Sequence, residues 1–143
     1  MLDAAPNLRA LFPVIDIQAV VSRGVDQGIA GMQTLAGSGR LRSNVVVHLG
    51  TNGGFSARQL DQLVDIAAGR RLVVLTNHCP YCGWVAANNA VIRAGCTAAR
   101  RCAVADWNGL ANANPQWFGR DGVHMPIGGV GGQAYAELVA RDL

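Results

Sequence analysis

Residues 44–54 read Asn-Val-Val-Val-His-Leu-Gly-Thr-Asn-Gly-Gly and decide the fold of this chain. Residues 45–49 are mostly β-branched and apolar without polar alternation, which is typical of a strand buried on both faces of a parallel sheet. The run leads into residues 50–53, a turn that brings backbone N–H groups and one amide side chain to the carboxyl end of the strand. Ligands bind at that end in open α/β sheets, so we expect any active site there.

Strand and helix patterns alternate along the rest of the chain. Apolar runs predict further strands, and apolar residues at helical spacing predict the helices between them. The predicted strands cover 14–21, 45–49, 72–76 and 102–105; the predicted helices cover 2–12, 25–37, 56–68, 84–94 and 130–143, with a long loop after residue 105. The alternation predicts an α/β fold with a parallel sheet, and the length of 143 residues predicts one domain, residues 1–143.

The composition excludes several classes of protein. Half of the residues are apolar and 15% are charged, which is not the composition of a disordered chain. The twelve basic residues are all Arg and are scattered, so we expect no nucleic-acid partner. The sequence shows neither a signal peptide nor an apolar run long enough to span a membrane.

Three short motifs carry polar groups suited to catalysis. Asp121 precedes His124 by three residues, so its carboxylate can orient the imidazole as a general base; a turn Asp beside a surface His is the simpler alternative. Asn52 can donate its amide to an oxyanion while Gly50 keeps the approach open, although Asn-Gly is also a turn signal. Gly24 precedes a predicted helix and can offer a backbone N–H, or serve a tight turn.

Two stretches resemble a known family. Residues 45–53 (VVVHLGTNG) and 105–124 (ADWNGLANANPQWFGRDGVH) are similar to the later motifs of the SGNH/GDSL hydrolases. The likeness is greatest to the SGNH domains associated with bacterial membrane O-acyltransferases, and it covers nearly the whole chain. It implies a three-layer flavodoxin-like sheet and a Ser-His-Asp triad, without a metal or an organic cofactor. By position, His124 and Asp121 become triad members, and Asn52, Gly24 and Gly50 become oxyanion residues.

The sequence departs from the family pattern at its N-terminus. The family nucleophile is a Ser in a Gly-Asp-Ser motif on the first strand, and this chain begins at Met1 just after the position of that motif. We therefore expect the first strand and the Ser to lie upstream of Met1. Ser22 is a weak substitute, and Ser56 is better explained as a helix cap.

The resemblance implies acyl transfer, as an O-acyltransferase or a carboxylester hydrolase. The expected substrate is an acylated cell-surface carbohydrate or another small ester, and a membrane acyltransferase domain is an expected partner. We then expect an extracytoplasmic or membrane-associated location. The alternative is a non-catalytic remnant or binding module of the same fold, which would be inactive.

Four cysteines, at positions 79, 82, 96 and 102, suggest a third interpretation. The Cys-x-x-Cys spacing of Cys79 and Cys82 occurs in redox and zinc sites. Structural disulfides or buried thiols explain the same residues, and the sequence leaves their pairing open.

Overall fold

The computed structural model describes residues 1–143 and contains one parallel sheet of three strands in the order β1-β2-β3. The strands are β1 (Asn44–Val47), β2 (Arg71–Leu75) and β3 (Cys102–Ala105). The α-helices are α1 (Ala5–Leu11), α2 (Val25–Gly37), α3 (Ala57–Ile66), α4 (Val85–Gly95), α5 (Trp107–Asn112) and α6 (Val130–Asp142); two 3₁₀ turns, η1 (Ala98–Arg100) and η2 (Pro115–Trp117), complete the list.

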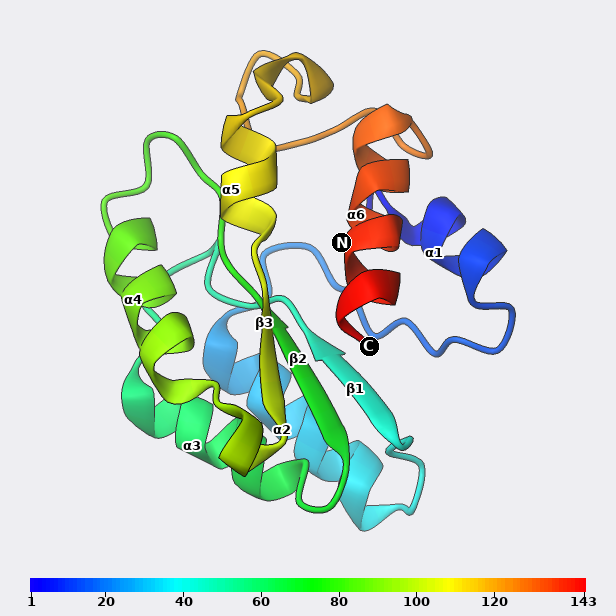
Figure 1. Cartoon of the computed structure of the whole chain (residues 1–143), viewed down its shortest axis with the longest axis vertical. Coiled ribbons are helices and arrows are strands. Elements are labelled where there is room, and N and C mark those ends of the chain that lie inside the picture. The colour runs from blue at the N-terminus through cyan, green and yellow to red at the C-terminus, as the bar shows by residue number, and fades with distance from the viewer.

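The helices cover both faces of the sheet, as Figure 1 shows. Successive side chains of a strand point to opposite faces, so each strand feeds two hydrophobic cores. Val45, Val47, Leu72 and Val74 pack with α2, α3 and α4, whereas Val73, Leu75 and Ala105 pack with α1, α5 and α6. The predicted α/β fold with a parallel sheet is therefore confirmed.

Helix boundaries follow local capping signals. Ser56 caps α3: Ser56 Oγ accepts from the Gln59 N–H at 3.3 Å, and Gln59 Oε1 accepts from the Ser56 N–H at 2.9 Å. This reciprocal pair satisfies donors that a helix start leaves free. Gly39 and Gly69, with φ of +70° and +78°, follow the ends of α2 and α3.

Two predictions were wrong: the strand at residues 14–21 and the long loop after residue 105. Residues 14–21 form no strand; they have irregular structure with a turn at Val14 and at Val21 and no ladder partner, and these two side chains are 76% and 77% exposed. The β-branched pattern alone does not form a strand when no neighbouring strand pairs with it. The predicted long loop after residue 105 contains α5, which Asp106 caps through the Gly109 N–H, and η2.

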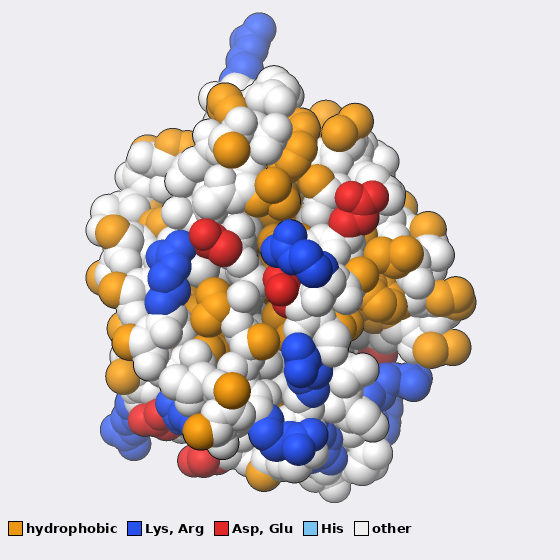
Figure 2. All heavy atoms as spheres, in the orientation of Figure 1, with side chains coloured by type: hydrophobic (Ala, Val, Ile, Leu, Met, Phe, Trp, Pro, Cys, Tyr) orange, Lys and Arg blue, Asp and Glu red, His pale blue; other side chains and the backbone are white.

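The cysteines form two disulfides, Cys79–Cys82 and Cys96–Cys102. Both Cys-x-x-Cys thiols are thus oxidised, and no group of three His, Cys, Asp or Glu side chains is arranged to hold a metal ion. No helix combines the length and apolar character needed to cross a bilayer. On the face drawn in Figure 2, Arg side chains are dispersed among polar and apolar ones.

Candidate functional site

The turn after β1 has a backbone that only glycine adopts easily. Gly50 has φ of +109° and Gly53 has φ of +147°. A Cβ at Gly50 would overlap Asn77 Oδ1 and would lie 2.9 Å from Asn88 Nδ2. The turn therefore lies directly against two buried amide side chains, one from the segment that follows β2 and one from α4.

Asn88 on α4 connects this turn to the core. Its Nδ2 donates to the carbonyl oxygens of Gly50 and Gly53, both at 2.9 Å, and its Oδ1 accepts from the Phe55 N–H at 2.7 Å. Asn77, which follows β2, donates through Nδ2 to the Leu49 carbonyl at 2.7 Å. Because these amides are buried, they fix the turn that carries Asn52.

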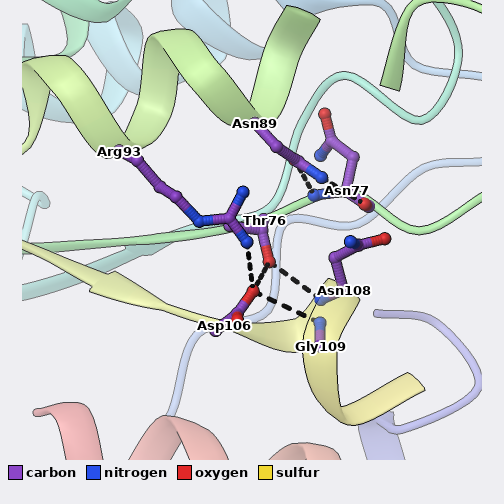
Figure 3. A network of polar contacts seen from close by, with 7 residues as sticks. All are labelled: Thr76, Asn77, Asn89, Arg93, Asp106, Asn108 and Gly109. Atoms are coloured by element: carbon purple, nitrogen blue, oxygen red, sulfur yellow. Dashed lines mark hydrogen bonds and ion pairs between the residues drawn. The ribbon is translucent and has the colours of Figure 1, made fainter. Parts of the chain in front are cut away.

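None of these buried amides is predicted by the motifs in the sequence. Asn89 exchanges hydrogen bonds with the backbone of Asn77 at 2.6 and 2.9 Å, and Figure 3 shows that pair beside the end of β2. The signal was present in the sequence: Asn88 and Asn89 interrupt an otherwise apolar helix, and Asn77 follows an apolar strand. Polar residues in such places must find hydrogen-bond partners when they are buried.

A second network joins the ends of β2 and β3 (Figure 3). Thr76 Oγ1 donates to Asp106 Oδ1 at 2.8 Å and accepts from the Asn108 N–H at 2.8 Å; Arg93 Nη2 lies 2.8 Å from the same carboxylate oxygen. Partial burial raises the pKa of Asp106, but the hydrogen bonds from Thr76 and Gly109 and the charge of Arg93 outweigh it and hold the pKa below its usual range. This network fixes the start of α5.

Asp121 and His124 form a close pair in the loop before α6. Asp121 Oδ2 accepts from His124 Nδ1 at 2.7 Å, and Oδ1 accepts from the N–H groups of Val123 and His124, both at 2.9 Å. These bonds, the backbone N–H of His124 first, hold the pKa of Asp121 well below its usual range. The carboxylate therefore stays ionised and fixes the imidazole tautomer that leaves Nε2 free to accept a proton.

The loop with His124 rests on the segment after β2. His78 Nε2 donates to the Gly122 carbonyl at 3.0 Å, and a Cβ at Gly122 would lie 3.1 Å from Pro80 Cγ. The His78 ring also packs on Phe118, with centroids 4.8 Å apart. Residues 78–80 therefore support the backbone that positions Asp121 and His124.

The predicted oxyanion residues lie close to one another. Asn52 Nδ2 donates to the Arg23 carbonyl at 3.3 Å, which places this side chain beside the residue that precedes Gly24. The Gly24 N–H donates to Gln27 Oε1 at 3.1 Å, whereas the Gly50 N–H has no partner within the chain. The Gly50 N–H is thus free, the Asn52 amide keeps the second of its two hydrogens free, and Gly24 would first have to exchange the Gln27 contact.

A cavity of about 1280 Å³ lies beside the edge strand β1, and we call it the β1 cavity. It extends between β1, the irregular residues 14–23, and the loops that carry Asn52 and His124. Ser22 lines it, but no hydroxyl is hydrogen-bonded to His124 Nε2. The structure therefore brings Asn52, Gly50 and His124 to one cavity and leaves space for a further group.

The sequence of this chain was compared with known families and proteins. No family model matches it. It is 30% identical over 139 residues to the peptidoglycan O-acetyltransferase OatA of Listeria monocytogenes, across 97% of this chain and 22% of that protein. It is 26% identical over 125 residues to the putative peptidoglycan O-acetyltransferase YrhL of Bacillus subtilis, across 87% of this chain and 20% of that protein. The chain thus spans about a fifth of the length of these relatives.

The fold has a solved counterpart. The C-terminal catalytic domain of peptidoglycan O-acetyltransferase A from Streptococcus pneumoniae, solved with a methylsulfonyl adduct, superposes with a TM-score of 0.88 at 23% identity. The match covers 99% of this chain and 86% of that chain. The predicted SGNH fold is confirmed, and these relatives do not favour the non-catalytic alternative.

Proposed function

Because the homologues of this chain are OatA-type peptidoglycan O-acetyltransferases and its fold is that of an OatA catalytic domain, we propose that it performs acyl transfer on cell-wall carbohydrate. The observation that carries this proposal is the Asp121–His124 pair at the β1 cavity. Residues 1–143 would form the greater part of one SGNH domain.

His124 would act as general base and Asp121 as the group that orients it. In such a reaction a serine hydroxyl attacks the acyl carbon of an ester, and its proton passes to His124 Nε2. The leaving alkoxide then takes that proton, and the acyl group remains on the serine. Transfer to a sugar hydroxyl, or to water in hydrolysis, repeats these steps in reverse and frees the serine.

The negative charge on the acyl oxygen would be stabilised by Asn52 with Gly50 or Gly24. Preorganised N–H donors at the place where the charge develops lower the barrier most. The free N–H of Gly50 and the second amide hydrogen of Asn52 support this assignment, and Asn88 holds their turn in place. These groups supply the chemistry without a metal or an organic cofactor.

The serine would come from residues that precede Met1. The β1 cavity supports this proposal, because it borders both the unpaired edge of β1 and His124. A strand that paired with this edge in parallel would end near the Asn52 turn, since the carboxyl ends of parallel strands meet at one edge of the sheet.

The proposed substrate is an acylated cell-wall carbohydrate, and the proposed location is extracytoplasmic. The names of the relatives support both, because peptidoglycan lies outside the cytoplasmic membrane. The proposed partner is a membrane acyltransferase domain, which would supply the acyl group.

Hydrolysis of p-nitrophenyl acetate tests the proposed chemistry. We expect a chain extended upstream to include a Gly-Asp-Ser segment to hydrolyse this ester, and His124→Ala to reduce the rate to background. A general base contributes roughly 10²–10⁴-fold, so the loss is easily measured.

Arg58→Ala is the matched control, because Arg58 is an exposed residue of α3 without a side-chain hydrogen bond. We expect it to hydrolyse the ester like the unmodified extended chain. Equal rates for His124→Ala and the unmodified extended chain would refute the assignment.

A further inference from the structure

The segment between β2 and α4 joins the two halves of the proposed site. On one side, His78 and Pro80 contact Gly122 in the loop of His124. On the other side, Trp84 Nε1 donates to the Gly50 carbonyl at 3.1 Å, in the turn of Asn52. The Cys79–Cys82 disulfide closes the loop between these contacts, so its side chains have a fixed position relative to both halves.

This segment presents two aromatic rings to solvent at the β1 cavity. Tyr81 is 71% exposed and Trp84 is 41% exposed, and both line the cavity together with Asn52 and His124. The Tyr81 hydroxyl makes no hydrogen bond within the chain. Large apolar side chains held exposed beside a functional cavity mark binding surfaces.

Tyr81 and Trp84 do not serve the packing of the hydrophobic core, unlike the other two tryptophans. Trp107 is buried against Tyr135, and Trp117 stacks on Trp107, so those two indoles complete the packing of α5 and α6. Tyr81 instead lies inside the short loop that the Cys79–Cys82 disulfide closes, and Trp84 lies two residues beyond that loop, where its Nε1 donates to the Gly50 carbonyl. Aromatic rings whose backbone is held by a covalent link or whose side chain is hydrogen-bonded lose less conformational entropy when a ligand binds.

From this arrangement we infer that Tyr81 and Trp84 form the acceptor-sugar platform of the site, an inference that rests on the proposed function. A pyranose ring has one face of C–H groups, which packs on the electron-rich face of an aromatic ring, while its hydroxyls stay in water. A β-1,4-linked N-acetylhexosamine chain offers such a face at each sugar. Stacked here, one sugar would lie between the turn of Asn52 and the loop of His124, where acyl transfer would occur.

Binding of chitotetraose, a soluble β-1,4-linked N-acetylglucosamine tetramer, tests this platform without any catalysis. Isothermal titration of the 143-residue chain should give a measurable Kd. We expect Tyr81→Ala to weaken binding by about 3- to 10-fold, the effect typical of one aromatic contact. Tyr81→Phe keeps the ring and should bind within about 2-fold of the wild type, which a purely hydrogen-bonding role would not allow.

Ile127→Ala is the matched control, because Ile127 is 76% exposed and does not line the β1 cavity. Its Kd should equal that of the wild type. If Tyr81→Ala binds chitotetraose as the wild type does, or if the wild type does not bind it, the platform is refuted. The ester assay with the extended chain is independent of these results, so failure of the platform and failure of the proposed acyl chemistry are distinguishable.

Discussion

Gly50 shows how one residue can be fixed by both its backbone and its neighbours. Its φ of +109° lies in a region that side chains with a Cβ rarely adopt, and a Cβ there would overlap Asn77 Oδ1. Its carbonyl accepts from both Trp84 and Asn88. The same residue therefore links the turn of Asn52, the buried amides and the proposed sugar platform.

His48, at the end of β1, makes the stability of the fold depend on pH. Its Nδ1 lies 3.0 Å from the Tyr135 hydroxyl, and its Nε2 is buried without a partner. Burial, and then the nearby N-terminal ammonium group, lower the pKa of His48 from 6.5 to about 3. The folded state therefore keeps this ring neutral at a pH where the unfolded state protonates it.

We expect the free energy of unfolding to fall as pH drops below 6.5, the pKa of an unperturbed His. Between pH 7 and 5 the unfolded chain binds a proton that the folded chain does not, so His48 alone should cost about 2 kcal/mol. Urea denaturation at the two pH values measures this loss. His48→Asn keeps a hydrogen-bonding group near Tyr135 but cannot titrate, so its loss should be smaller by that amount. The same loss in both proteins would contradict the assignment.

At the scale of elements, the sequence was sufficient to predict a helix or strand whose signals lie within that one element. The helix cap at Ser56 predicted the start of α3, and the apolar runs predicted β2 and β3. The strand predicted at 14–21 failed because a strand also needs a partner, which no local pattern reveals. Asp121 and His124 are three residues apart, so the sequence could pair them; Asn88 and Gly50 are brought together only by the fold.

Replacing Asn88 tests whether α4 stabilises the turn that carries Asn52. Asn88→Ala would leave the Gly53 carbonyl and the Phe55 N–H without their side-chain partner, and the Gly50 carbonyl would keep only its hydrogen bond from Trp84. Each unsatisfied buried group is costly, so we expect a loss of about 3 kcal/mol in the free energy of unfolding, measured in urea.

Asn112→Ala is the control for that measurement. Asn112 lies in α5, is exposed and makes no side-chain hydrogen bond, so its replacement changes the same atoms without removing a buried contact. We expect a change within about 0.5 kcal/mol for this control. A similarly small change for Asn88→Ala would show that the turn does not depend on α4.

At the scale of the whole molecule, the sheet is unevenly covered. β2 is buried along four of its five residues, whereas β1 pairs on one side only and borders the β1 cavity on the other. Val14, Val20 and Val21, which lie along that cavity, are 76%, 57% and 77% exposed. Protein interiors are normally close-packed, so the part of this cavity that borders the unpaired edge of β1 and residues 14–21 is space that another strand can fill, apart from the mouth lined by Asn52, Tyr81 and His124.

If a strand preceding Met1 pairs with the free edge of β1, the extended chain should be more stable than residues 1–143 alone. Such a strand would bury the edge of β1 and part of the exposed surface of residues 14–21, so unfolding would expose more surface. The urea m-value scales with that surface. We therefore expect both the m-value and the free energy of unfolding to rise in the extended chain. A control extension of equal length with Gly and Ser in place of the apolar residues should raise neither, because it has no apolar side chains to bury. Equal values for the two extensions would mean that the β1 cavity is not completed by this segment, and the serine of the proposed triad would have to reach His124 by another path.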